Sequence, residues 1–194
     1  PLESRSTTVV PTTNRVLASG VVEFSADRWY STVEVAADDA LRPALSATAS
    51  YESIAGWLVG AGRWSHPDIR NPYAAPVSSV SSLGNEAGLM IGLHSRTFNG
   101  WRVEASVDLH TLLSRSWGRP LPSVGMDLLM DAEHRLSSAA LLSVRLRHEL
   151  DDEGWTPPET SRQIMVRRER STVRGEVTYL PMRELRVRVR ADVR

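Results

Sequence analysis

The end of the chain alternates apolar and charged side chains without a break. Leucine, valine or alanine occupies every odd position from 185 to 193, and arginine or aspartate occupies every even position from 186 to 194. Successive side chains of a β-strand point to opposite faces of a sheet, whereas those of a helix repeat every 3.6 residues. The pattern therefore predicts a strand with one apolar and one charged face.

A second strand of the same kind precedes this one. Apolar or small residues at 173, 175, 177 and 179 alternate with polar residues at 174, 176 and 178. Pro181 falls in the expected connection, 180–184, where its missing N–H removes no ladder hydrogen bond. Together the two segments predict a long hairpin that is apolar on one side and densely charged on the other.

The same period recurs through most of the chain, and Asn99-Gly100 between two such segments is typical of a tight hairpin turn. Gly56, Gly60 and Gly62 share one face of their segment, which predicts a bend or a close approach there. Residues 1–14 are interpreted as an entry segment or loop before a β-domain at 15–194, with long loops near 64–84, 111–124 and 150–162. The remaining expected strands lie at 21–26, 29–37, 45–52, 54–63, 85–94, 101–110, 125–131 and 142–149.

The lengths of these segments favour a membrane-spanning sheet. Each is about ten residues long, and a tilted strand needs roughly 9–11 residues to cross a bilayer. From residue 54 onward, long and short connections alternate. Barrels of bacterial outer membranes have long loops outside and tight turns on the periplasmic side. The fold predicted is therefore all-β: an antiparallel up-and-down transmembrane β-barrel with about ten strands visible, complete or partial.

Composition excludes some classes of function. The 23 basic residues, all arginine, balance 23 acidic ones, so net charge gives no reason to expect nucleic acid as a partner. The absence of cysteine excludes disulfides and thiolate metal sites. The sequence contains no run of about 18 apolar residues, so it predicts no transmembrane helix. We expect the chain to be a piece of a longer protein from which any signal peptide is missing.

Alternation alone leaves two arrangements open. In a soluble sandwich the apolar face packs inward and the charged face meets water, whereas in a membrane barrel the apolar face meets lipid and the charged face lines the lumen. Trp29, Tyr51, Trp101 and Tyr179 lie near expected strand ends, where aromatic girdles of a barrel would lie. Balanced Arg and acidic residues would also form paired ladders across a narrow lumen. These features favour the barrel.

Several short motifs support that choice through a resemblance. They are Arg63, Pro72-Tyr73-Ala74, Asn85-Glu86-Ala87-Gly88-Leu89, Val107-Asp108-Leu109, Pro122-Ser123-Val124-Gly125 and the closing Arg-rich hairpin. The series, across residues 56–194, resembles the barrel region of Bacteroidetes-type outer-membrane proteins, members of which often carry an N-terminal helix-hairpin-helix segment. This sequence has no such segment, so a DNA-handling role does not carry over. The resemblance implies a barrel and supplies no function of its own.

Catalytic and metal-binding motifs are missing from the sequence. No G-x-S-x-G nucleophile elbow, Gly-rich phosphate loop or H-E-x-x-H is present, and nothing in the sequence places a Ser beside a His. His94 and His110 fall at opposite ends of the hairpin set by Asn99-Gly100, so they cannot share a metal ion. We expect no enzymatic activity, no cofactor and no metal site. Asn85 and Glu86 more plausibly fix the start of a strand than bind a ligand.

The expected function is that of a porin-like protein of the bacterial outer membrane, in transport, passive permeation or anchoring, with the lipid bilayer as its partner. One alternative is a soluble β-sandwich or β-barrel that serves as a binding or structural module, and another is an outer-membrane hydrolase. The best candidates for function are charged side chains expected to face the lumen, because such charges tune what enters a pore. They are Arg102, Glu104, Asp108, Arg145, Arg147, Arg174, Glu176, Arg186, Arg188 and Arg190.

Overall fold

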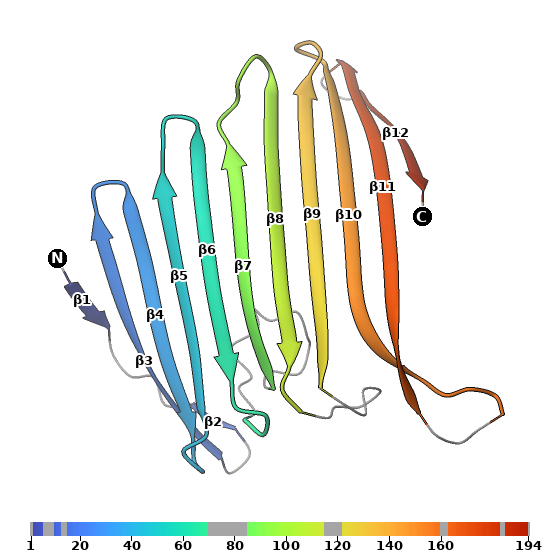
Figure 1. The fold of residues 1–194 in the computed structure, drawn as a ribbon. Coiled ribbons are helices and arrows are strands. Elements are labelled where there is room, and N and C mark those ends of the chain that lie inside the picture. Colours follow the sequence, from blue (N-terminus) through green and yellow to red (C-terminus); the bar gives the residue numbers. More distant parts are fainter. Residues whose placement is uncertain are drawn as a thin grey trace.

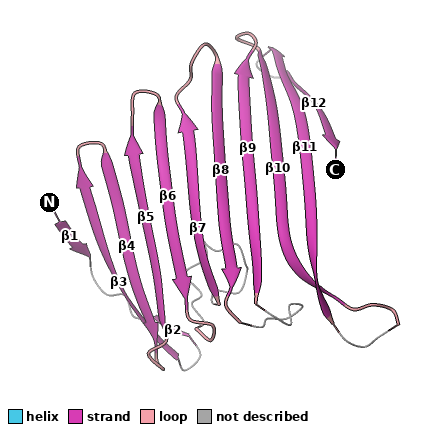
Figure 2. Ribbon diagram, viewed as in Figure 1, coloured by secondary structure: helices cyan, strands magenta, loops and turns pink. Residues whose placement is uncertain are grey.

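The computed structural model describes residues 2–5, 10–12, 15–69, 85–114, 122–159, 163–182 and 185–193. All the regular structure in these ranges is β-strand (Figures 1 and 2). The strands are β1 (Leu2–Arg5), β2 (Val10–Thr12), β3 (Arg15–Ala26), β4 (Trp29–Asp38), β5 (Pro43–Glu52), β6 (Gly56–Ser65), β7 (Glu86–Ser95), β8 (Trp101–Leu112), β9 (Ser123–Arg135), β10 (Ala140–Trp155), β11 (Ile164–Met182) and β12 (Leu185–Val193).

The strands form one antiparallel sheet in which each long strand pairs with the next along the chain. The spatial order is β1-β3-β4-β5-β6-β7-β8-β9-β10-β11-β12, and β2 also pairs with β3. This confirms the predicted all-β, up-and-down architecture. The sheet is open, because β1 and β12 lie at opposite edges and no pairing joins them in the described part of the chain (Figure 1). The described strands therefore form no closed barrel.

The connections differ between the two ends of the sheet. At one end the strands are joined by the short segments 27–28, 53–55, 96–100, 136–139 and 183–184, and at the other by 39–42, 66–85, 113–122 and 156–163 (Figure 1). The alternation of long and short connections after residue 54 is therefore present. Some strands extend beyond their expected bounds: β10 continues to Trp155, where a loop was expected from 150, and β11 continues to Met182 past Pro181. Residues 1–14, expected as a loop, contribute β1 and β2.

Two tight turns show how local chemistry fixes the register. Asn99 and Gly100 have φ angles of 49° and 80°, the left-handed conformation that an Asn-Gly turn requires. At the opposite end of the sheet, one carboxylate oxygen of Asp38 accepts hydrogen bonds from the backbone N–H groups of Ala40 and Arg42, each at 3.0 Å. The other oxygen accepts one from the Arg42 side chain at 2.7 Å. These bonds satisfy the polar groups that the turn removes from the sheet ladder.

Alternation along each strand and the register between strands give the sheet an apolar face and a polar face. On the apolar face, large side chains stay exposed: Leu89 retains 52% of its accessible surface, Ile91 54% and Val189 66%. Among the described residues, the buried hydrophobic side chains are only Ala36, Ala61, Ile69 and Leu112, fewer than the six buried polar ones. The described residues thus form no ordinary apolar core. Members of the apolar face include Val22, Val33, Val35, Leu45, Leu58, Trp64, Leu89, Ile91, Leu93, Val107, Leu109, Leu128, Met130, Leu146, Val173, Val177, Tyr179 and Val187.

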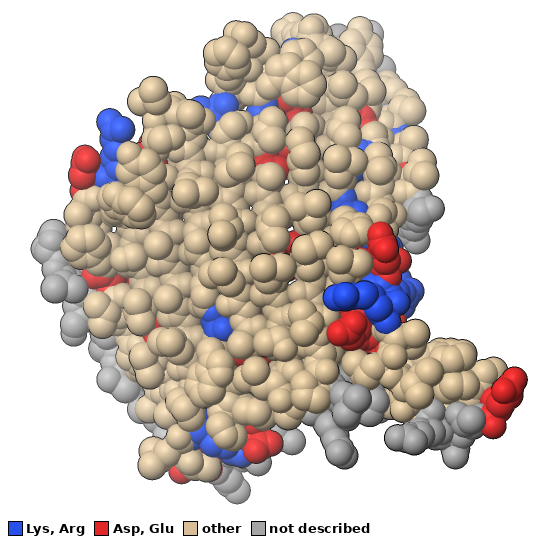
Figure 3. All heavy atoms as spheres, in the orientation of Figure 1, with Lys and Arg blue, Asp and Glu red and all other residues tan. Residues whose placement is uncertain are grey.

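No second sheet covers the apolar face in the described part of the chain. The face turned to the viewer in Figure 3 has few charged side chains over the middle strands, and a cluster of them over the lower part of β10 and β11. A sandwich of two stacked sheets, the arrangement expected for the soluble alternative, is not formed by the described residues. The described residues also contain no helix that is long and apolar enough to cross a membrane.

Candidate functional site

The register places the ten charged residues singled out in the sequence on the polar face. Three lie on β8, two on β10, two on β11 and three on β12. Arg145 on β10 faces Arg174 on β11, and Glu176 on β11 faces Arg190 on β12. The structure therefore brings together residues from four strands that lie far apart in the sequence, in rows that cross β8 to β12.

Most of these arginines form ion pairs with carboxylates. Arg102 lies 2.7 Å from Glu133, Arg145 lies 2.7 Å from Asp131, and Arg174 lies 2.7 Å from Asp192. Further pairs at 2.6 to 3.1 Å join Arg147 to Glu149, Arg188 to Glu176 and Arg190 to Asp192. The opposed arginines of neighbouring strands are thus neutralised by carboxylates on the same face. The sequence had not singled out Asp131, Glu133, Glu149 or Asp192, because only the register shows which carboxylate meets which arginine.

These ladder pairs contribute little to stability individually. The side chains of Arg145 and Arg147 keep 51% and 55% of their surface exposed. An exposed ion pair is typically worth about 0–1 kcal/mol, because water and salt screen it and two long side chains lose freedom. The ladders therefore determine the charge of the polar face more than the stability of the fold.

One ion cluster on the polar face is buried. The Arg63 guanidinium on β6 donates to both carboxylate oxygens of Asp108 on β8, each at 2.9 Å, and its Nε donates to Glu86 on β7 at 2.6 Å. The exposed fractions of these side chains are 8% for Arg63, 19% for Asp108 and 3% for Glu86. A bidentate guanidinium–carboxylate contact is among the strongest polar contacts in proteins. Removing Arg63 would take the neutralising guanidinium away from both carboxylates.

A glycine makes room for this cluster. Gly88 on β7 lies opposite Arg63 in the register, and a Cβ atom at Gly88 would stand 2.5 Å from the Arg63 Cζ atom. Four residues from the motifs that carry the resemblance, Arg63, Glu86, Gly88 and Asp108, thus meet in one place. Another of those motifs, 72–74, lies outside the described residues.

Asp108 of this cluster also belongs to the one group of described residues that could hold a metal ion. Asp108, His110 and Asp127 offer three ligand atoms within 4.8 Å of one another. His110 is buried, and its ring stands over Gly125 on β9, where a Cβ atom would lie 2.2 Å from Nε2. Two carboxylates and an imidazole suit Mn²⁺ or Zn²⁺. Both oxygens of Asp108 already accept hydrogen bonds from Arg63, however.

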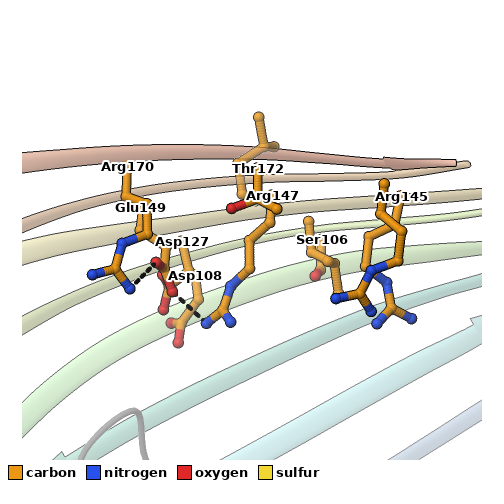
Figure 4. A pocket seen from close by; sticks show the side chains of 11 residues that line it. Ser106, Asp108, Asp127, Arg145, Arg147, Glu149, Arg170 and Thr172 are labelled. Carbon is orange, nitrogen blue, oxygen red and sulfur yellow. Dashed lines mark ion pairs between the residues drawn. The ribbon is translucent and has the colours of Figure 1, made fainter. Parts of the chain in front are cut away.

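A hollow of about 570 Å³ opens on the polar face beside this group. Figure 4 shows Glu149 between Arg147 and Arg170, to which it is paired at 2.6 and 3.8 Å, with Asp108 and Asp127 nearby. Arg170, Glu149 and Asp127 were not among the residues expected from the sequence. The hollow presents charges of both signs, contributed by β8, β9, β10 and β11.

The remaining polar residues have mainly structural contacts. His94 pairs with Glu104 at 2.9 Å, whereas His110 lies opposite Gly88 toward the other end of β8, so the two histidines cannot share a metal, as predicted. The Asn85 side chain donates to the backbone carbonyl of Ser114 at 2.8 Å and accepts from its N–H at 2.6 Å. Asn85 thus ties the start of β7 to the end of β8, the strand-fixing role expected for it.

The apolar face holds one contact that the sequence did not reveal. His148 on β10 and Ser171 on β11 are register partners, and the Ser171 Oγ atom lies 2.9 Å from His148 Nδ1. The two residues are separated by a long connection, so no local motif contains both. The only available signal was a His and a Ser at positions where the alternation calls for apolar side chains.

Comparison with known proteins gives no family for the chain. No protein-family model matches it, and no curated protein matches it either. The geometry of the two faces therefore carries the functional argument.

Proposed function

We propose that the chain is the strand-forming part of a porin-like β-barrel in a bacterial outer membrane, with its apolar face against lipid and its polar face toward a lumen. The observation that carries the proposal is the inverted distribution of side chains. Valines, leucines and aromatic residues stay exposed on one face, while Arg63, Glu86 and His110 are buried on the other. Hydrocarbon is the solvent that suits such an exposed face.

Water would suit the apolar face poorly. Contiguous apolar patches on soluble monomers rarely exceed about 300–600 Å², and leaving apolar surface in water costs about 25 cal/mol per Å². The apolar face continues across every long strand from β3 to β12. A lipid contact also explains why residues such as Ile91 and Val107 have no partner layer, because a sheet in a bilayer needs none.

The polar face favours a permeation role over simple anchoring. An anchor requires only an apolar exterior, whereas this sheet lines a hollow with charges of both signs. Rings of charged side chains set which solutes pass through a pore. We therefore assign the function as transport or passive permeation of small polar or charged solutes, with the arginine ladders as the selective surface.

The absence of cysteine from the chain allows a direct test. Ser106 and Val107 are neighbours on β8 with opposite facings, since Val107 pairs with Ile91 and Ser106 with Gly92. Ser106→Cys and Val107→Cys variants would be refolded into phosphatidylcholine vesicles and labelled with an environment-sensitive fluorophore. We expect brominated lipid to quench the label at 107 strongly and the label at 106 weakly.

Two outcomes would contradict this assignment. Equal quenching of both labels would show that the faces do not differ in their contact with lipid. A chain that stays monomeric in buffer without detergent, and shows no heat-modifiable migration on a gel, would instead favour a soluble binding or structural module. The matched pair Met90→Cys and Leu89→Cys on β7 repeats the comparison on the neighbouring strand.

A further inference from the structure

The Ser171–His148 contact lies at a boundary on the apolar face. On one side of this contact, the outward-facing residues of both strands are apolar or glycine. They are Tyr179, Val177, Gly175 and Val173 on β11, and Leu142, Val144 and Leu146 on β10. The next outward pair is His148 and Ser171. Beyond it, the outward pairs are Leu150 with Glu169 and then Asp152 with Arg167. The pair therefore sits where the apolar band of β11 ends, one outward position before the band of β10 ends at Leu150.

A carboxylate lies on the other side of the imidazole ring, within ion-pair range but beyond hydrogen-bond distance. Glu169, two residues before Ser171 and on the same face of β11, places Oε1 3.9 Å from His148 Nε2. Ser171 Oγ lies on the other side of the ring, 2.9 Å from Nδ1. A hydroxyl hydrogen-bonded to an imidazole is the nucleophile–base pair of serine hydrolases, which are recognised by geometry rather than by sequence position. Glu169 lies on the side of the ring where the orienting carboxylate of such enzymes stands.

We propose that Ser171 and His148 form a catalytic pair that hydrolyses carboxylic esters of membrane lipids. The proposal rests on the lipid-facing assignment above, because the pair lies on the outward face rather than toward the lumen. Ser171 is exposed and His148 retains 28% of its side-chain surface, so a lipid ester lying against the sheet can reach both. The proposal returns to the hydrolase alternative. The sequence had disfavoured that alternative because nothing in it places a Ser beside a His.

The chemistry follows from the placement of the atoms. Ser171 Oγ attacks the ester carbonyl while His148 Nδ1 takes the hydroxyl proton, and the tetrahedral intermediate then expels the alcohol, which receives that proton. Water next attacks the acyl-serine, His148 takes its proton, and collapse returns a proton to Ser171 Oγ and releases a carboxylic acid. The balance is one ester and one water converted into one acid and one alcohol.

The surroundings define the class of substrate. An acyl chain can lie along the apolar band beside Val173 and Leu146, which brings its ester group to the row of Ser171. The head group would then reach Glu169, Arg167 and Asp152, where the face is charged and water is available. Arg167 and Asp152 lie 3.8 Å apart, so this surface presents both signs to a zwitterionic or anionic head group. The substrate is therefore an amphiphile with an acyl ester at the membrane–water boundary.

Hydrolysis by the refolded full chain tests this proposal. Vesicles of dioleoylphosphatidylcholine and dioleoylphosphatidylglycerol, with and without lipopolysaccharide, would be assayed for released fatty acid, and the two arms distinguish phospholipid from lipopolysaccharide esters. We expect release by the wild type, and a loss of at least about a hundredfold in Ser171→Ala and in His148→Ala. Ser31→Ala is the matched control, since Ser31 also faces outward but pairs with Phe24 and Ala49.

A covalent probe separates this proposal from the membrane assignment. A fluorophosphonate should label Ser171 of the chain in detergent micelles, and Ser171→Ala should abolish that labelling while Ser31→Ala keeps it. If the wild type inserts into vesicles with heat-modifiable migration but neither reacts with the probe nor releases fatty acid, the hydrolase proposal fails and the barrel proposal stands. If the chain does not insert, labelling in micelles still decides whether Ser171 is a nucleophile.

Glu169 has a positioning role, which a second measurement identifies. Because its carboxylate contacts His148 and not the ester, Glu169→Gln should lower kcat by about tenfold and leave KM unchanged. A Glu169→Asp variant should recover part of that loss. An unchanged kcat in Glu169→Gln would remove Glu169 from the mechanism, and a rise in KM alone would assign it to head-group binding.

Discussion

The two halves of the sheet have similar apolar faces and different polar faces. From β3 to β6 the polar face carries mainly hydroxyl and small side chains, such as Thr32 and Thr48, whose Oγ1 atoms lie 2.5 Å apart. From β8 to β12 it carries ladders of arginine and carboxylate. The apolar face continues through both halves and is interrupted only at one end of β10 and β11, where polar and charged side chains face outward. The alternation on the apolar face thus follows from the fold, whereas the chemistry of the polar face differs between the halves and, under the proposed function, would carry the specificity.

The buried Arg63 cluster lies where the two halves meet. Arg63 is on β6, its partners are on β7 and β8, and the ladders begin beyond it. A lone guanidinium among the neutral side chains of β6 would be costly, so the charged half has to supply its counter-ions across two strands. The cluster therefore couples the register of one half to that of the other.

The largest effect should follow from breaking this junction. Arg63→Met removes the guanidinium that pairs with the buried Glu86 and the half-buried Asp108, which should lower the free energy of unfolding by about 3–5 kcal/mol. Urea titration of the refolded chain in lipid vesicles measures the change. Arg102→Met removes an arginine that is paired but 46% exposed, and it should cost less than about 1 kcal/mol. Equal costs for the two variants would mean that Arg63 does not join the halves.

The next prediction compares the apolar faces of the two halves. Val33→Arg on β4 and Val177→Arg on β11 each place a charge on the apolar face of one half. An arginine facing lipid near the bilayer midplane costs roughly 2–4 kcal/mol, falling toward about 0–1 near the interfaces. We expect costs in the upper range for both variants and blocked assembly in vesicles, with inward controls at Thr32→Arg and Glu176→Arg retaining assembly. If only one of the two variants loses stability and assembly, the apolar faces of the two halves have different surroundings.

Sequence reasoning recovers the part of this molecule that depends on local alternation. Val177, Val187 and Val189 could be assigned to one face because each strand repeats every two residues. Asn99-Gly100 correctly predicted the turn between β7 and β8. A barrel was predicted, whereas the described strands form an open sheet. Closure depends on pairing between distant edges, which local alternation does not encode. The Arg63 cluster and the Ser171–His148 contact were also missed. Both are set by the register between strands, which no single segment encodes.

The glycines show the same limit. The sequence predicted close approach or a bend at Gly56, Gly60 and Gly62. A Cβ atom at Gly56 would indeed lie 2.1 Å from the backbone oxygen of His94, but nothing lies within 4 Å of one at Gly60 or Gly62. The close approaches on the polar face occur instead at Gly88 and Gly125, beneath Arg63 and His110. Which glycine is crowded depends on the side chain across the ladder, not on the glycine's own strand.

Gly88→Ala should sharpen the contrast between the crowded polar face and the open apolar face. The new methyl group would displace the Arg63 guanidinium, so we expect a loss of about 1–3 kcal/mol in the free energy of unfolding, the usual cost of overpacking. Gly60→Ala is the control, because a Cβ atom there meets nothing within 4 Å. It should be neutral or slightly stabilising, since alanine restricts the unfolded chain. A neutral Gly88→Ala would show that Arg63 can move without loss of its ion pairs.

The smallest expected effects distinguish the polar faces of the two halves, because the stability cost of a substitution should depend on salt in only one of them. Thr32→Val breaks the hydroxyl contact with Thr48 and should cost about 0.5–1.5 kcal/mol, the net worth of a neutral hydrogen bond. Arg145→Met breaks an exposed ion pair with Asp131 and should cost about 0–1 kcal/mol. Because the Debye length falls to about 3 Å at 1 M salt, the cost of Arg145→Met should vanish there while that of Thr32→Val remains. Urea titrations at low and high salt measure both. If the cost of Arg145→Met does not change with salt, water and ions do not reach that ion pair as its exposure indicates. The ladders of β8 to β12 would then be shielded from solvent, as the Arg63 cluster is.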